Sequence, residues 1–256
     1  TLFRSVQEIG QGSRAGSLRS MAWRLFEARD SAWAQHAFKS AVEDVVRASG
    51  AKHVLEVGGG RSPLFSREEI DALQVRYACN DISEAELARA PAYVDKVCFD
   101  IAGEVSLVDA YDLIFSTMVF EHVSSGARAY RNVFQLLKPG GVAINFHPVL
   151  FSPPFVANLL LPEAVSRKVL RAFFPPQRVD SAPKFPARYS WCYAHRRMER
   201  KLKGVGFSDA LIVPFYGHVY FRSIPVLRDL DQRLTRWAER RDFRPLASYA
   251  VTLVRK

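Results

Sequence analysis

The stretch from residue 53 to residue 64, HVLEVGGGRSPL, constrains the fold more than any other part of the chain. Its apolar run, residues 54–57, is typical of a short buried parallel strand. Gly58, Gly59 and Gly60 follow, and glycines allow a turn with positive φ that a ligand can approach closely. Ser62 and Pro63 then predict a helix start, because a hydroxyl caps a helix and proline suits its first position. Strand, glycine turn and helix start together predict a cofactor cradle at the carboxyl end of a strand.

Short strands alternate with helices along most of the chain. Strands are expected at residues 54–57, 75–79, 96–99, 111–116, 142–146, 209–215 and 247–255. Helical spacing covers 18–48, and helices are expected from residue 62 and over 83–90, 126–137, 195–204 and 225–240. This alternation predicts an α/β fold with a Rossmann-like, doubly wound, seven-stranded and mostly parallel sheet whose last strand is antiparallel.

The chain divides into a helical lead-in and one larger domain. Residues 1–50 are expected to form the lead-in, and residues 51–256 the cofactor-binding domain. Within that domain, residues 148–195 hold eight prolines and eight aromatic residues, and they interrupt the sheet pattern after the fifth strand. We interpret 148–195 as an inserted helical and aromatic lid over the substrate.

Charge is distributed unevenly. The net charge is −4 for residues 51–150 and +12 for residues 151–256. The basic part predicts an anionic partner, such as a phosphorylated or lipid-linked substrate, a membrane surface or nucleic acid. A solvated basic surface explains the same charge, so both interpretations stay open. No apolar run approaches the length of about 18 residues that a membrane-spanning helix needs.

The three cysteines are odd in number, so they cannot all form disulfides, and their spacing is not that of metal ligands. Both features favour a protein of the reducing cytoplasm. The cysteines are Cys79, Cys98 and Cys192. Cys79 and Cys98 lie in apolar strand-like runs, so both are expected to be small buried residues.

The residues around the glycine turn indicate the cofactor. A nicotinamide dinucleotide fingerprint, G-x-G-x-x-G, would need glycine where Pro63 stands, which makes an oxidoreductase the least favoured interpretation. Glu56, Gly58 and Gly60 instead match an acidic-x-Gly-x-Gly-x-Gly motif, with Ser62 replacing its last glycine. At these residues the chain resembles the class I S-adenosylmethionine-dependent methyltransferases, in particular their type 11-like group.

The resemblance extends over residues 53–146. Asp81 stands where the family places the acid that holds the ribose hydroxyls, and a carboxylate can accept from two vicinal hydroxyls. Asp100 and Ile101 resemble its adenine site, and the sequences YDLIFSTMVFEHV and LLKPGGVAI resemble its fourth and fifth strands with their loops. The resemblance implies S-adenosylmethionine as cofactor and S-adenosylhomocysteine as product. It implies a cofactor site made of Glu56, Gly58, Gly59, Gly60, Asp81, Ile82, Asp100, Ile101, Ser116, Thr117 and Met118.

Methyl transfer needs alignment of the acceptor, and a hydroxyl acceptor also needs a group that takes its proton. His122 and His147 follow the fourth and fifth strands and are the catalytic candidates. Alternatively, the pair Glu121-His122 fastens its loop, and His147 serves only a turn. Some relatives that act in quinone biosynthesis use a metal-binding acid where this chain has Met118, so no metal is expected.

Motifs that the sequence lacks narrow the range of possible methyl acceptors. The loop after the fourth strand lacks the Asn/Asp-Pro-Pro-aromatic motif of amino-directed enzymes, and no Pro-Cys nucleophile or nucleic-acid module is present. Small-molecule, sugar and lipid-linked acceptors remain, and residues 155–207 loosely resemble methyltransferases of bacterial glycan pathways. We therefore expect O-methylation of a small or glycan-like acceptor, anionic or lipid-linked ones included, by a cytoplasmic enzyme.

Two alternatives remain open. One is a lipid methyltransferase in peripheral contact with the inner membrane face, anchored by the basic amphipathic segment Glu163–Phe174. The other is a non-catalytic protein that binds S-adenosylmethionine and acts through protein contacts. The sequence leaves the oligomeric state open.

Overall fold

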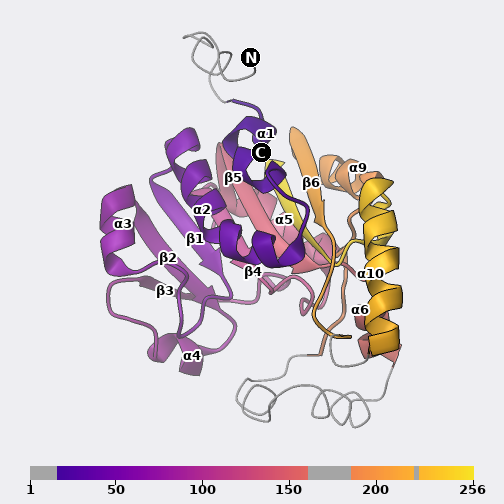
Figure 1. Cartoon of the computed structure of the whole chain (residues 1–256). Helices are drawn as coiled ribbons and strands as arrows, with labels where there is room; N and C mark the ends of the chain where they lie inside the picture. The colour runs from indigo at the N-terminus through magenta and orange to yellow at the C-terminus, as the bar shows by residue number, and fades with distance from the viewer. Residues whose placement is uncertain (1–15, 161–185, 222–224) are drawn as a thin grey trace.

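A computed structural model describes residues 16–160, 186–221 and 225–256. Its core is one seven-stranded sheet in the order β3-β2-β1-β4-β5-β7-β6 (Figure 1). All neighbouring strands are parallel except that β7 is antiparallel to both β5 and β6. The predicted sheet is thereby confirmed. The strands are β1 His53–Val57, β2 Arg76–Asp81, β3 Asp95–Cys98, β4 Tyr111–Thr117, β5 Leu137–Pro148, β6 Asp209–Phe215 and β7 Tyr249–Arg255.

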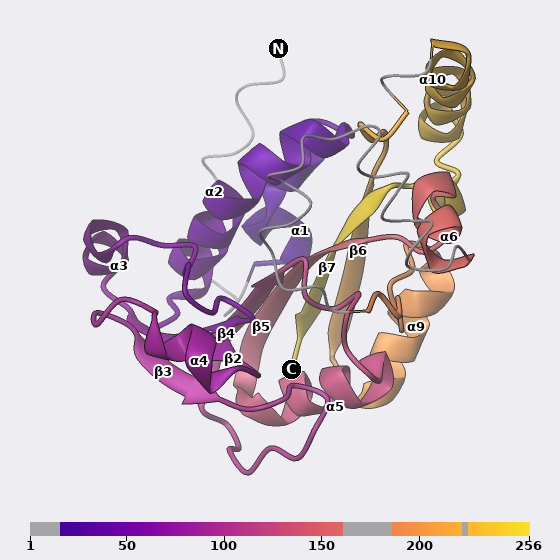
Figure 2. The same ribbon diagram turned by 90° about the horizontal axis from the view of Figure 1, so that it is seen from below.

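Helices cover both faces of the sheet (Figure 2). One face carries α1 Leu18–Met21, α2 Ser31–Ser49 and α3 Arg67–Leu73, and the other carries α5 Gly126–Leu136 and α9 Arg196–Val205. The short helix α4 Glu84–Ala88 packs against β2 and β3. Beyond β6, at the end of the sheet opposite β3, lie α6 Pro153–Leu160 and α10 Pro225–Arg240 (Figures 1 and 2). Two 3-10 turns, Trp23–Phe26 and Arg244–Leu246, complete the described elements.

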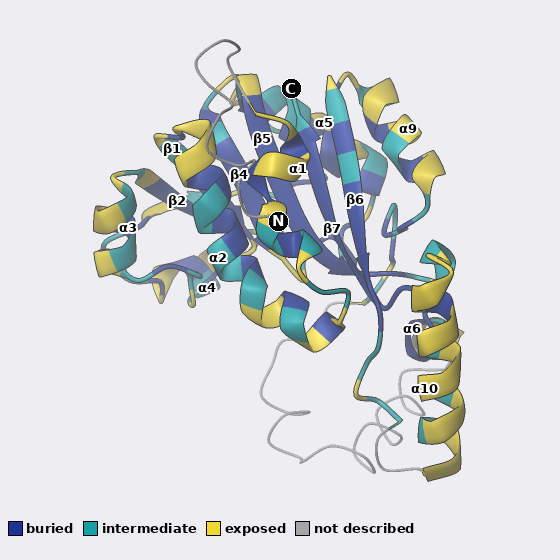
Figure 3. Ribbon diagram, turned by 45° about the horizontal axis from the view of Figure 1, so that its top comes forward, coloured by how far each residue is buried: buried dark blue, intermediate teal, exposed yellow. Residues whose placement is uncertain are grey.

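The helix α2 shows how the local sequence produces this packing. Its N-cap Asp30 accepts a hydrogen bond from the backbone N–H of Trp33, and Gly50 ends it in the left-handed conformation. Its buried side includes Phe38, whose ring lies 5.5 Å from that of Phe146 on β5. A fully buried side chain of this size contributes about 1.5–3 kcal/mol to folding. Buried residues concentrate along the strands, and exposed ones on the outer helix surfaces (Figure 3).

The sheet topology brings the ends of all seven strands to one edge. Strands β1 to β6 run in the same direction and all end there, so the loops after them are neighbours. Because β7 is antiparallel, its first residue Tyr249 pairs with Pro148, the last residue of β5, at the same edge. This carboxyl edge is where a ligand can meet residues from both halves of the chain.

Two local expectations are wrong. The helix after the glycine turn begins at Arg67 rather than at Ser62, because Ser66 and Glu69 form a capping box that satisfies two backbone N–H groups. Cys98 is exposed because it lies at the end of the edge strand β3, whereas Cys79 is buried as expected.

Two expectations on the organisation of the chain stay predictions. The segment Glu163–Phe174 lies outside the described residues. The lead-in boundary at residue 50 and the lid function of 148–195 are likewise untested by the fold. Within the described ranges, no helix is both long enough and apolar enough to cross a membrane.

Candidate active site

The glycine turn after β1 is shaped by close backbone contacts. Gly58 and Gly60 have φ of +75° and +51°, values that favour glycine. The N–H groups of Gly58 and Gly59 both donate to the carbonyl of Asn80 on β2, at 2.9 and 3.0 Å. A side chain at Gly58 would collide with Val119 of the loop after β4. The turn is therefore held between β2 and the β4 loop.

Asp81, at the end of β2, lies directly beside this turn. A Cβ atom placed on Gly60 would be 2.8 Å from Asp81 Oδ2, so only glycine leaves the carboxylate in place. Asp81 Oδ1 accepts from the backbone N–H of Ser83 at 2.8 Å, which fixes the orientation of the carboxylate. The adjoining Ile82 side chain is 58% exposed, so it offers an apolar surface at the same place.

Glu56 supports the turn from beneath. Its carboxylate is buried and accepts hydrogen bonds from the Tyr77 hydroxyl and, at 3.0 Å, from the backbone N–H of Leu64. Burial raises the pKa of Glu56 to about 6. A Cβ atom on Gly59 would be 2.7 Å from this carboxylate, so the middle glycine is required by Glu56. The structure thus places Glu56 under the loop, where it positions the loop instead of lining its outer surface.

An ion pair that the sequence analysis missed closes the turn on its outer side. Arg61 Nε and Nη2 donate to the two carboxylate oxygens of Glu86 on α4, at 2.5 and 2.6 Å. Such two-point contacts hold a guanidinium in one orientation. Arg61 and Glu86 are 25 residues apart, and no sequence motif links them. They could be paired only once the turn and α4 were placed.

After β3, only one of two expected residues reaches the carboxyl edge. Asp100 Oδ1 accepts from the backbone N–H of Ala102 at 2.8 Å and holds a tight turn. Ile101 is only 4% exposed, and its carbonyl accepts from Asn132 of α5. The turn at Asp100 directs the Ile101 side chain into the core, and its contact with a ligand ring stays a prediction.

The expected site residues at the end of β4 also differ in their exposure. Ser116 is fully buried and donates to Asn145 Oδ1 of β5 at 3.0 Å, and its contact with the cofactor stays a prediction. Thr117 and Met118 lie nearer the surface, and Met118 is 37% exposed. Met118 has φ of +56°, and its N–H donates to the carbonyl of Phe146, which turns the chain out of the sheet.

His147 is enclosed within the sheet. Its ring is 1% exposed, and its two nitrogens lie 3.0 Å from the Pro148 carbonyl and 3.0 Å from Thr252 Oγ1. Burial lowers the pKa of His147 to about 4. β5 continues past His147 and β7 pairs with it there, and a catalytic role for this histidine stays a prediction.

Glu121 and His122 lie together in the loop after β4. His122 Nε2 is 3.8 Å from Glu121 Oε1, and the His122 side chain is one-third exposed. Glu121 is only 3% exposed, and its Oε2 has no hydrogen-bond partner among the described residues. Burial raises the pKa of Glu121 to about 8. From sequence Glu121 is expected only as a partner of His122, because the burial of a charged residue in an apolar run is not visible in sequence.

Five aromatic residues surround this region, and we call them the aromatic cluster: Phe146, Phe155, Tyr189, Tyr220 and Tyr249. Phe155 of α6 is central, with its ring 5.5 to 5.9 Å from those of the three tyrosines. Burial, with a smaller contribution from the charge of Glu121, raises the pKa of Tyr249. The Glu121 carbonyl accepts from the N–H of Tyr189 at 2.9 Å, so the buried acid borders the cluster.

Comparison with known proteins identifies the domain. Residues 32–151 match the family model described as a methyltransferase domain. Residues 32–151 are therefore a methyltransferase domain, and the sheet around them has the class I, Rossmann-like arrangement. No curated protein sequence matches it significantly.

Solved structures with a similar fold include three methyltransferases. Phosphoethanolamine N-methyltransferase 2 of Haemonchus contortus, solved with phosphomonomethylethanolamine and S-adenosylhomocysteine, has 15% identity and a TM-score of 0.50 over 80% of this chain and 49% of its own. A methyltransferase of Archaeoglobus fulgidus has 15% identity and a TM-score of 0.49, over 89% and 100%. One of Mesorhizobium loti has 18% identity and a TM-score of 0.46, over 80% and 91%.

The residues present fit the cofactor of this methyltransferase family. The decisive observation is Gly60, where any side chain would strike Asp81 Oδ2, so that turn and carboxylate form one close-walled cradle. Asp81 would hold the ribose hydroxyls, and Ile82 would supply the adjoining apolar surface. The backbone of Gly58, Gly59 and Gly60 would line the same cradle, and Thr117 and Met118 would border it.

Proposed function

We propose that the enzyme methylates a hydroxyl group of a small, glycan-like acceptor, and that anionic or lipid-linked sugars are among its acceptors. The observation that carries the proposal is the buried carboxyl group of Glu121, whose Oε2 has no partner among the described residues and which borders the aromatic cluster. Aromatic faces and tyrosine hydroxyls suit a sugar ring, because they combine apolar surface with hydrogen-bonding groups.

When bound, S-adenosylmethionine supplies an activated methyl group on its sulfonium. The chain's own residues then have two tasks. Four rings of the aromatic cluster are at most 6% exposed, so the cluster excludes water from Glu121, and the acceptor is oriented at its partly exposed member, Tyr220. Glu121, as carboxylate, accepts the proton of the acceptor hydroxyl at Oε2, and a pKa near neutrality suits a group that takes up and releases a proton. His122, 3.8 Å from the other carboxylate oxygen, stabilises the charged form when it is itself protonated.

The test is transfer of labelled methyl groups from S-adenosylmethionine to bacterial extracts separated into glycan, lipid and small-molecule fractions. We expect label in a hydroxyl-bearing product whose methyl group is identified as an ether by NMR. Label found only on nitrogen or carbon would contradict the proposal.

Wild type and Glu121→Gln should be compared in the same assay. Glutamine keeps the shape of the side chain but cannot take the proton, so the label should fall strongly. Equal labelling by both proteins would remove Glu121 from the reaction. Label confined to lipids without sugar would instead favour a lipid methyltransferase.

A further inference from the structure

The helix α10 carries an apolar stripe that the fold does not use. Val226, Leu227, Leu230, Leu234 and Trp237 are between 39% and 71% exposed. At 3.6 residues per turn these five side chains fall within an arc of about 100°. The helix contacts the protein through another side, where Ala238 is fully buried and Asp231 lies 3.1 Å from the ring of His218. The stripe is therefore a surface and not part of the core.

Cationic side chains border the stripe. Arg233, Arg236 and Arg240 are exposed and lie on the arc next to it, away from the protein body. This pattern, a leucine and tryptophan face bounded by arginines, is that of helices that lie in a membrane interface. The helix is about 24 Å long at 1.5 Å per residue. Two further leucines, Leu159 and Leu160, are exposed at the end of α6, which lies next to α10 (Figures 1 and 3).

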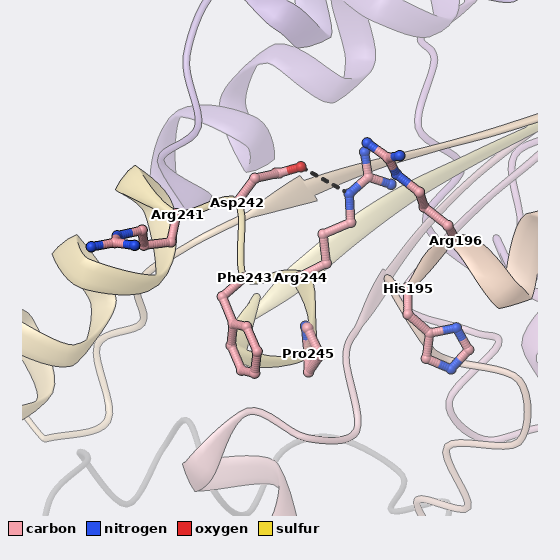
Figure 4. A pocket seen from close by; sticks show the side chains of 7 residues that line it. All are labelled: His195, Arg196, Arg241, Asp242, Phe243, Arg244 and Pro245. Carbon is pink, nitrogen blue, oxygen red and sulfur yellow. Dashed lines mark hydrogen bonds and ion pairs between the residues drawn. The ribbon is translucent and has the colours of Figure 1, made fainter.

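A cationic pocket of about 400 Å³ lies just past the C-terminal end of α10. Arg196 enters it from α9, and Arg241 and Arg244 come from the segment that follows α10 (Figure 4). Arg244 is paired with Asp242 and Glu199, at 3.2 and 3.3 Å. Arg196 and Arg241 form no ion pair with any residue that the structure describes. Figure 4 shows the Arg196 side chain beside Arg244, whereas the Arg241 side chain points away from both. Each unpaired guanidinium group can bind a phosphate group.

Phe243 joins the stripe to the pocket. It is 43% exposed, lines the pocket, and its ring lies 5.4 Å from that of Trp237 at the end of the stripe. The apolar surface of the stripe is therefore continuous with the cationic pocket. This order matches a phospholipid, in which the acyl chains lie next to the phosphate-bearing headgroup.

We propose that α10 and this pocket form a docking surface for an anionic phospholipid membrane. The stripe enters the boundary between headgroups and acyl chains, the flanking arginines extend to the headgroups, and Arg196 and Arg241 each bind the phosphate of a different lipid. The charge of +12 over residues 151–256 complements such a surface. The proposal does not depend on the identity of the methyl acceptor.

The test is co-sedimentation of the full chain with vesicles of phosphatidylcholine, with and without one-third phosphatidylglycerol. Wild type should bind the anionic vesicles, less so in high salt, and should not bind the neutral ones. Leu230→Glu with Trp237→Glu should reduce binding to background. Arg196→Gln with Arg241→Gln should weaken it by about fivefold for each arginine removed.

Matched controls lie elsewhere on the surface. Leu107→Glu with Val108→Glu exchanges two other exposed apolar side chains, and Arg67→Gln removes another exposed arginine. Both should bind vesicles within about twofold of wild type. Equal losses in these controls, or unchanged binding by the stripe variant, would overturn the proposal. A dimer in analytical ultracentrifugation that needs Leu230 and Trp237, with no vesicle binding, would overturn it in favour of a second copy of this chain.

Discussion

Replacing Glu121 with glutamine should stabilise the folded protein, and the gain should increase with pH. Burial raises the pKa of this carboxyl from its ordinary value of about 4.5 to about 8 in the folded state. Between these values the unfolded chain releases a proton that the folded protein keeps, so the free energy of unfolding falls as the pH rises. Glutamine stays neutral in both states and escapes this loss.

The magnitude depends on the size of the shift. The pKa of this carboxyl group in the unfolded chain is about 2.5 units below pH 7. At 1.36 kcal/mol per unit, its burial lowers the free energy of unfolding at pH 7 by about 3 kcal/mol. Below about pH 4 the carboxyl group is mostly protonated in both states, so the penalty nearly disappears. Glu121 thus combines a destabilising position with the property that the reaction would need, as is common at functional sites.

Urea unfolding followed by circular dichroism at pH 5 and pH 8 measures this difference. The free energy of unfolding of Glu121→Gln should exceed that of wild type by more at pH 8 than at pH 5. Glu104→Gln, at an exposed carboxyl, is the control and should show no such trend. A difference between Glu121→Gln and wild type that is the same at both pH values would refute the reasoning.

Two further predictions concern the cradle and the reaction. Gly60→Ala and Gly50→Ala both place a side chain at positive φ and should each lower stability by roughly 1–2 kcal/mol. Only Gly60→Ala should also weaken S-adenosylmethionine binding, by at least about tenfold in calorimetry, because a Cβ at this position would displace Asp81. A Cβ at Gly50 would meet nothing within 4 Å, so Gly50→Ala should leave the affinity unchanged. In steady-state assays, Glu121→Gln should lower kcat by about 10²–10⁴-fold, and His122→Ala should lower it less. The reverse order would return the role of base to His122.

The fold was predictable because its signals are local and repeated. The apolar runs and the helical spacing between them predicted a seven-stranded sheet of this kind, and the match to β6 and α10 is close at both ends. The start of α3 was misplaced because Ser62-Pro63 and Ser66 through Glu69 are both helix-start patterns. The hydrogen bond from Leu64 N–H to Glu56 and the capping box of Ser66 with Glu69 show that the turn continues past Pro63.

The site was only partly predictable, because residue type does not specify which way a side chain points. The spacing of Asp81 and the glycines in the sequence predicted that they lie at one site, and the structure brings them together. Ser116, Ile101 and His147 stood at promising positions, but each is enclosed by a neighbouring element that pairs or packs across it. The partnership of Arg61 with Glu86 arises from tertiary contacts alone, and so does the exposure of the apolar stripe on α10, which by spacing would be expected to face a core.

The claim that the turn after β1 and Asp81 form the cofactor cradle is tested most directly by isothermal titration with S-adenosylmethionine. Wild type should bind one equivalent. Asp81→Ala should bind more weakly by about 1.5–3 kcal/mol, which is roughly a 10- to 150-fold rise in Kd, through loss of a charge-assisted hydrogen bond to the ribose. An unchanged Kd in Asp81→Ala, with the variant folded as judged by circular dichroism, would contradict the account.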